Sequence, residues 1–186
     1  MLSLSMGGEL ALYRALHLLR LSRISDYLHT LSEALAIDPL APLLATLLQP
    51  LYSSSCERLV VVSPWIEDVA FMLSPALSTL LGLPRILTLS MILAEARSRG
   101  VQVVVVTRSS RHDSVPYQSV ERASLYTLAG IEPIIDNTVH SKCVETPTHA
   151  YISTANLTEL ELAKARKGKN ISAIEPSQRC YPIEKP

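Results

Sequence analysis

Cysteine, aromatic residues and net charge are all scarce in this sequence. Its 186 residues include three cysteines, one tryptophan and one phenylalanine, and 17 basic residues balance 17 acidic ones. Cys56, Cys143 and Cys180 are widely spaced and form no Cys-x-x-Cys pattern, so the sequence predicts neither a disulfide framework nor a zinc site. We expect Cys143 to pack towards the core. The neutral balance excludes a generally basic surface and leaves a local patch as the only basis for nucleic-acid binding.

An uninterrupted apolar segment long enough to cross a membrane is also missing, although 48% of the residues are hydrophobic. The most apolar window, residues 71–91, contains Pro75, Pro84 and Arg85, which disfavour a spanning helix. Residues 1–23 lack the basic start of a secretory signal and are interrupted by charges. We therefore expect a cytoplasmic protein without integral membrane association.

Runs of β-branched apolar residues alternate with helical patterns, which predicts an α/β fold. The runs at 59–63 and 101–106 are apolar throughout, as is typical of strands buried on both faces. Shorter strands are expected at 131–135, around residue 140, at 150–153 and within 169–174. The expected helices span residues 9–21, 25–36, 40–51, 68–82, 85–99, 120–129 and 157–167.

Three regions follow from this pattern. Residues 1–38 form an N-terminal helical extension that is too small for a core of its own and packs on the main domain or on a partner subunit. Residues 39–175 form the main domain, and residues 176–186, with three prolines, form an irregular tail. The two helices expected within 68–99 carry more apolar side chains than one sheet face needs. These side chains belong to the core, to a dimer interface or to a lipid-facing surface.

Two basic side chains stand out in the segment Val139-His140-Ser141-Lys142. Because side chains alternate along a strand, His140 and Lys142 would point to the same face. Each also has an ordinary interpretation, since a lone histidine on a strand is usually a packed or surface residue and a lysine is usually a solvated charge.

A second polar group follows the turn Thr146-Pro147-Thr148. The strand at 150–153 would deliver Thr154 and Asn156 beside the first pair. Asn156, with Glu159 three residues later, predicts a capped helix start whose first amides face the same place, although Asn156 could be an N-cap alone. An imidazole, an ammonium group, a hydroxyl, a carboxamide and a helix N-terminus together suit a phosphate.

The sequence His-x-Lys, a hairpin and then Ile-Ser-Thr-Ala-Asn-Leu-Thr resembles the HKD motif of the phospholipase D-like superfamily. Residues 58–66 and 99–108 resemble that superfamily's first two strands, and the resemblance spans about residues 41–174. It implies a mixed sheet flanked by helices. In that superfamily, short members with one motif per chain act as homodimers. Such short members resemble nucleases more than lipases.

The resemblance also implies roles for individual residues. One His140 attacks phosphorus to give a phosphohistidine while its mate protonates the leaving oxygen. Lys142, Asn156 and Thr154 hold the non-bridging oxygens, and Ser153 and Arg108 join the substrate-binding set. The chemistry requires no metal and no cofactor.

The motif departs from the family pattern at three places. The family's aspartate falls on Pro147, the glutamate that orients the histidine falls on Ser172, and the hairpin is one residue shorter than usual. Glu145 or Glu175 could replace the missing carboxylate. Three interpretations therefore stand: a nuclease, a phosphodiesterase acting on phospholipid, and a catalytically degenerate HKD-fold module for dimerisation or binding.

Overall fold

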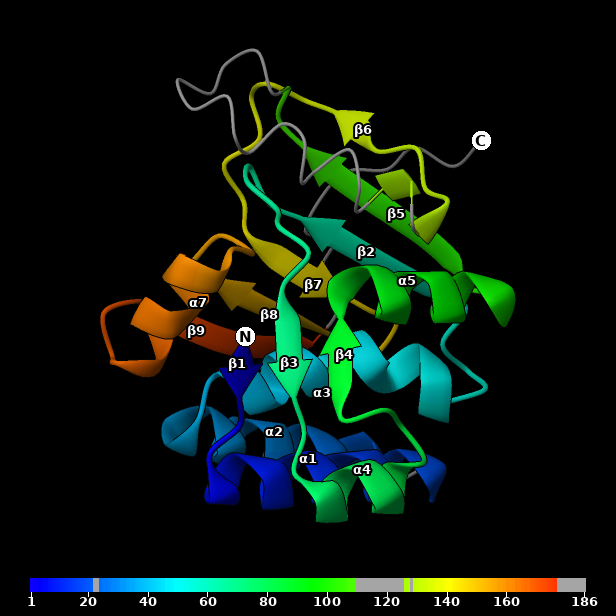
Figure 1. Cartoon of the computed structure of the whole chain (residues 1–186), viewed down its shortest axis with the longest axis vertical. Helices are drawn as coiled ribbons and strands as arrows, with labels where there is room; N and C mark the ends of the chain where they lie inside the picture. The colour runs from blue at the N-terminus through cyan, green and yellow to red at the C-terminus, as the bar shows by residue number, and fades with distance from the viewer. Residues whose placement is uncertain (22–23, 110–125, 128, 177–186) are drawn as a thin grey trace.

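In the computed structural model, the described residues are 1–21, 24–109, 126–127 and 129–176. They form a mixed α/β fold with a six-stranded sheet, a smaller three-stranded sheet and helices packed against them (Figure 1). The predicted fold class, α/β with a mixed sheet flanked by helices, is confirmed. The predicted helix 120–129 and the loop following Ser109 lie mostly outside the described residues, as does the tail beyond Pro176.

The six-stranded sheet contains both parallel and antiparallel pairs. Parallel pairing joins β6 to β5 and β5 to β2, and antiparallel pairing joins the remaining neighbours. The order across the sheet is β6 (Ile134–Ile135), β5 (Gln102–Thr107), β2 (Arg58–Val62), β7 (Cys143–Glu145), β8 (His149–Ser153) and β9 (Ser172–Pro176).

Strand β2 lies inside the sheet and buries both of its faces, as its sequence predicts. Leu59 and Val61 join the main core, whereas Val60 and Val62 belong to a second apolar cluster. Strand β5 is less buried than expected, because Gln102 at its start is exposed.

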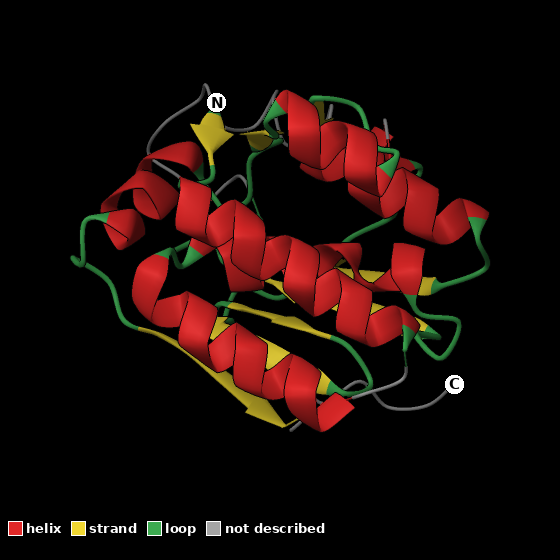
Figure 2. Cartoon of the chain, turned by 90° about the horizontal axis from the view of Figure 1, so that it is seen from below, coloured by secondary structure: helices red, strands yellow, loops and turns green. Residues whose placement is uncertain are grey.

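Helix α3 (Leu40–Tyr52) is the central helix of the core, and its residues 40–51 are all buried. Helices α1 (Met6–Arg20) and α2 (Ile24–Ile37) pack on α3 and share its hydrophobic cluster. Seen from below, the helices lie over the strands (Figure 2). The N-terminal helices were expected to pack either on the main domain or on a partner subunit, and in the structure they pack on the main domain.

The side chain of Asp38 connects the starts of two helices, α1 and α3, to the end of a third. Its buried carboxylate accepts hydrogen bonds from the backbone nitrogens of Ser5 (2.7 Å) and Leu40 (3.1 Å). The same group pairs with Arg166 Nη2 at 3.3 Å, at the end of α7 (Glu159–Arg166). Since a buried carboxylate needs partners, this arrangement fixes the N-terminal helices relative to α7.

The two long helices predicted at 68–82 and 85–99 are confirmed only in their later parts, because a short strand replaces the start of each. The segment contains two strands and two helices instead: β3 (Ala70–Met72), α4 (Pro75–Leu81), β4 (Ile86–Thr88) and α5 (Leu89–Ser98). Strands β3 and β4 pair with β1 (Leu2–Ser3) as the second sheet. Strands of three residues are too short to show a period of two, which is why the pattern missed them.

The apolar side chains of this segment mostly enter the core. Phe71, Leu77, Leu87 and Leu93 are buried in the main cluster. In the described ranges no helix is both long enough and apolar enough to cross a membrane.

Candidate functional site

The predicted strand through His140 begins later than expected. Strand β7 starts at Cys143, so His140 and Lys142 lie in the segment that enters it. Lys142 is nevertheless held next to the hairpin, because its carbonyl accepts a hydrogen bond from Ser153 N at 2.9 Å.

A turn at Asp136 positions the His140 segment. The Asp136 carboxylate accepts hydrogen bonds from the backbone nitrogen (2.8 Å) and hydroxyl (2.6 Å) of Thr138, as is typical of an Asx turn. Asp136 N donates to Thr107 O at 2.9 Å. His140 is thereby brought close to the carboxyl end of β5, next to Arg108.

A pocket of about 300 Å³ opens beside this segment. It contains four of the six predicted site residues, and its lining consists of His140, Ser141, Lys142, Cys143, Ile152, Ser153 and Thr154. Residues on both sides of the β7–β8 hairpin therefore converge on one cavity.

Arg108 contacts the imidazole of His140 directly. Its Nη2 lies 3.0 Å from Nδ1 and 2.9 Å from Nε2, and its Nε donates to Val139 O at 2.9 Å. A guanidinium only donates, so the ring nitrogen that it engages must be an unprotonated acceptor. A neutral imidazole has one such nitrogen, so only one of the two contacts can be a hydrogen bond at a time. Arg108 thus lies directly against the imidazole of His140.

Lys142 lies over the same segment, and its Nζ donates to His140 O at 2.7 Å. Partial burial lowers the pKa of Lys142, the nearby Arg108 lowers it further, and Glu161 of α7 opposes the shift. Two cations thus lie near one pocket, where Arg108 disfavours the charge of Lys142.

The two hydroxyls of the pocket already have neighbours. Ser153 Oγ accepts from Ala155 N at 3.0 Å and from Ser172 Oγ at 3.1 Å. Thr154 Oγ1 accepts from Ile171 N at 3.0 Å, yet the residue remains exposed. Thr154 can therefore reach a ligand more freely than Ser153.

Asn156 is set apart from the pocket and does not begin the following helix. It is buried, and its Oδ1 lies 3.5 Å from the Ser63 hydroxyl oxygen. The N-cap of α7 is Thr158, whose hydroxyl accepts from Glu161 N at 3.3 Å. Thr158-x-x-Glu161 is the better match to a capping box, so the predicted cap was placed two residues too early.

The first amide of α7 is also occupied. Glu159 N donates to Glu67 Oε2 at 2.9 Å. The expectation that this helix start faces the phosphate is therefore wrong for its first amide, because a carboxylate already fills that position.

Neither proposed replacement for the missing carboxylate contacts His140. Glu145 is buried at the far end of β7 and pairs with Arg58 Nη2 at 3.2 Å. Glu175 pairs with Ala150 across β8 and β9. Ser172, at the position of the family's glutamate, lies opposite Ser153 in the same ladder. In the described part of the chain, no carboxylate is in contact with His140.

The prediction that Cys143 packs towards the core is confirmed, whereas the prediction of no disulfide is wrong. Cys143 is buried and disulfide-bonded, so packing is not its only role. Within the described ranges, no three His, Cys, Asp or Glu side chains are grouped so that they could hold a metal ion.

Comparisons with known proteins give a structural similarity. No family model matches the sequence. No curated protein matches it either. Among solved structures, the chain is similar to a phospholipase D family member, Nuc from Salmonella typhimurium, with 14% sequence identity and a TM-score of 0.38. That similarity covers 71% of this chain and 90% of the other.

Proposed function

We propose that this chain is a metal-independent phosphodiesterase of the phospholipase D-like superfamily that cleaves nucleic acid as a homodimer. One observation carries the proposal: the HKD-like residues His140, Lys142 and Thr154 line a single pocket, with Arg108 against the imidazole. These residues come from both sides of a hairpin and from the end of β5. Their convergence is what the motif needs in order to act as a site.

The charges of the pocket favour an anionic ligand. Arg108 contributes to lowering the pKa of Lys142, which shows that the two cations repel each other. A phosphodiester between them would relieve this repulsion, since guanidinium and ammonium groups both donate charge-assisted hydrogen bonds to its oxygens. Arg108 would then exchange the imidazole for a phosphate oxygen and release the nucleophilic nitrogen.

The chemistry runs through a covalent intermediate. The neutral ring nitrogen of His140 attacks phosphorus, a nitrogen–phosphorus bond forms and the bond to the leaving oxygen breaks. The protonated His140 of the second protomer gives its proton to that oxygen. Water then attacks the phosphohistidine, gives a proton back to the second imidazole and releases the phosphate monoester. Lys142 stabilises the charge on the non-bridging oxygens.

The dimer would form next to the pocket. Ile171, whose backbone bonds to Thr154, is 77% exposed, and Leu160 at the start of α7 is 65% exposed. Large apolar side chains beside a half-site are suited to packing against a second copy. Ile171→Asp should shift the protein towards monomer in analytical ultracentrifugation and reduce cleavage, whereas the matched change at the exposed Met6 should do neither. A dimer that survives Ile171→Asp would contradict this placement.

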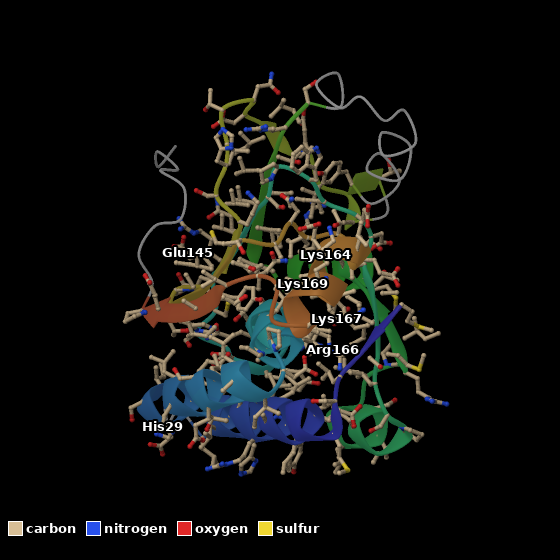
Figure 3. The ribbon with its side chains drawn as sticks, turned by 90° about the vertical axis from the view of Figure 1, so that its left-hand side faces the viewer. His29, Glu145, Lys164, Arg166, Lys167 and Lys169 are labelled. Carbon is tan, nitrogen blue, oxygen red and sulfur yellow. The ribbon has the colours of Figure 1, made fainter. Side chains whose placement is uncertain are left out.

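Nucleic acid is favoured by the basic residues around the end of α7. Figure 3 shows Lys164, Arg166, Lys167 and Lys169 together on one side of the molecule. Lys164 pairs with Glu161 at 2.5 Å and Arg166 pairs with Asp38, so both serve the fold. Lys167 and Lys169 are exposed, which leaves them for contacts to a phosphate backbone.

The decisive test is cleavage in EDTA. Hydrolysis of bis(p-nitrophenyl) phosphate, single-stranded DNA, RNA and phosphatidylglycerol vesicles is compared between wild type, His140→Ala and the exposed control His29→Ala. We expect chelator-resistant cleavage of nucleic acid that only His140→Ala abolishes. Equal activity in all three proteins would refute the histidine mechanism, and cleavage confined to the vesicles would reassign the substrate to phospholipid.

A catalytically degenerate binding module is the second candidate. It is favoured by the absence of a described carboxylate at His140, because a carboxylate partner fixes the tautomer of a catalytic imidazole. This candidate predicts a folded dimer that binds single-stranded DNA without cutting it. The same assay, read together with a binding measurement, separates the two.

A further inference from the structure

Trp65, the single tryptophan of the chain, has an unusual position for so large an apolar side chain. It follows the carboxyl end of β2 and is only half-buried. Its carbonyl accepts a hydrogen bond from the buried Ser63 hydroxyl at 2.7 Å, which anchors the backbone at that point.

Arg108 connects this indole to the candidate site. Its guanidinium carbon lies 5.9 Å from the centre of the Trp65 ring, and its Nη2 lies 2.9 Å from the His140 ring. The guanidinium therefore occupies the space between the indole and the imidazole. A cation on an aromatic face is favourable, and it also keeps the indole oriented towards the reacting residues.

The indole of Trp65 and the guanidinium of Arg108 are both suited to contact with a nucleobase. A flat aromatic ring and a guanidinium both stack on bases, and this contact tolerates every base because each has a π-face. When a phosphodiester draws Arg108 away from His140, the guanidinium still lies near the indole. The base attached next to that phosphodiester then has an aromatic surface beside it.

From this geometry we infer that Trp65 and Arg108 form a stacking platform for a nucleobase flanking the scissile phosphate, so that single-stranded nucleic acid is the substrate class. The inference rests on the proposed function for the place of the phosphate. A base inside a duplex already stacks on its neighbours, so the platform selects strands whose bases are free.

The single tryptophan makes a direct test possible. Fluorescence of Trp65 is recorded in the His140→Ala variant, in EDTA, during titration with oligothymidylate and with an abasic oligomer of equal length. Because His140→Ala prevents turnover, the signal reports binding alone. We expect quenching by oligothymidylate and little response to the abasic strand, which carries the same phosphates without bases.

Variants at the indole test its contribution. Binding of labelled oligothymidylate, followed by anisotropy in the same His140→Ala background, should weaken roughly 5- to 150-fold in Trp65→Leu, as for the loss of one stacked base. Trp65→Phe keeps an aromatic ring and should lose less than about threefold. Circular dichroism confirms that both variants remain folded, and abasic binding should be the same in all three proteins.

The outcomes separate this inference from the proposed function. Base-dependent quenching without cleavage by the wild type would leave the platform standing and overturn the hydrolase. If Trp65→Leu binds oligothymidylate and the abasic strand as tightly as its His140→Ala parent does, the platform is overturned even if cleavage occurs. A spectral shift with phosphatidylglycerol vesicles but not with oligothymidylate would overturn it in favour of a lipid contact.

Discussion

Two histidines lie at opposite ends of the β7–β8 hairpin, and their surroundings could hardly differ more. His140, before β7, is exposed, lines the pocket and contacts Arg108. His149, at the start of β8, is fully buried. Its Nε2 lies 2.9 Å from the Thr46 hydroxyl and its Nδ1 lies 2.9 Å from the Thr148 hydroxyl.

The buried imidazole belongs to the core. Its ring meets the Tyr27 ring edge-on, with 5.1 Å between the centroids, and Gln49 Nε2 extends the polar network to Thr148 at 2.8 Å. Burial lowers the pKa of His149 to about 4, so the ring is neutral near pH 7. The comparison teaches that two histidines of one hairpin serve different purposes: His149 is a desolvated part of the core, whereas His140 is exposed at the pocket beside a cation.

The largest expected effect is on catalysis at His140. His140→Asn should reduce phosphodiester cleavage by roughly 10⁴-fold or more, because the covalent step has no other nucleophile. Its free energy of unfolding should stay close to that of the wild type, since the side chain is exposed. Initial rates in EDTA and urea denaturation measure the two effects, and a variant with near-normal rates would remove His140 from the mechanism.

Lys142 should show the next largest effect. Lys142→Met keeps the aliphatic chain and removes the charge, and it should lower the rate by about 10²- to 10³-fold through loss of transition-state stabilisation. Lys169→Met, at an exposed lysine outside the pocket, is the control and should weaken substrate binding only slightly. Single-turnover rates at saturating substrate make the comparison. Equal effects at the two lysines would show that Lys142 contributes only general charge.

His149 should behave in the opposite way to His140. His149→Ala leaves a cavity and removes the partner of buried threonine hydroxyls, and should cost about 3 kcal/mol of the free energy of unfolding. The cleavage rate per folded molecule should be unchanged. Urea denaturation with His29→Ala as the exposed control tests this, and a stability equal to that of the wild type would contradict a structural role.

A pH dependence should distinguish the same pair. The unfolded chain protonates His149 below about pH 6.5, whereas the folded protein resists protonation until about pH 4. Stability from this group is therefore present above pH 6.5 and falls as the pH decreases to 4, by about 3 kcal/mol in all. In His149→Gln, the free energy of unfolding, measured by urea denaturation across this pH interval, should depend less steeply on pH. An unaltered slope would assign the dependence to other groups.

Parts of the fold followed directly from local sequence. The buried strand β2 and the apolar helix α3 were predicted nearly to their ends, because continuous apolar runs of strand and helix length leave little choice of environment. The hairpin β7–β8 was also predicted, since Thr146-Pro147-Thr148 breaks the chain between two apolar runs. Strands β3 and β4 were missed because each has three residues and gains stability only from partners distant in sequence.

The sequence by itself determined that polar, phosphate-suited residues gather between positions 140 and 156 and that an α/β sheet carries them. Only the tertiary structure decided which of them meet. It placed Arg108 against His140, put Asn156 beside Ser63 and buried His149. The physical reason is that residue type and local period fix which side chains are available. Solvent exposure, neighbouring charge and hydrogen-bond partners arise from strands and helices that pack from distant parts of the chain.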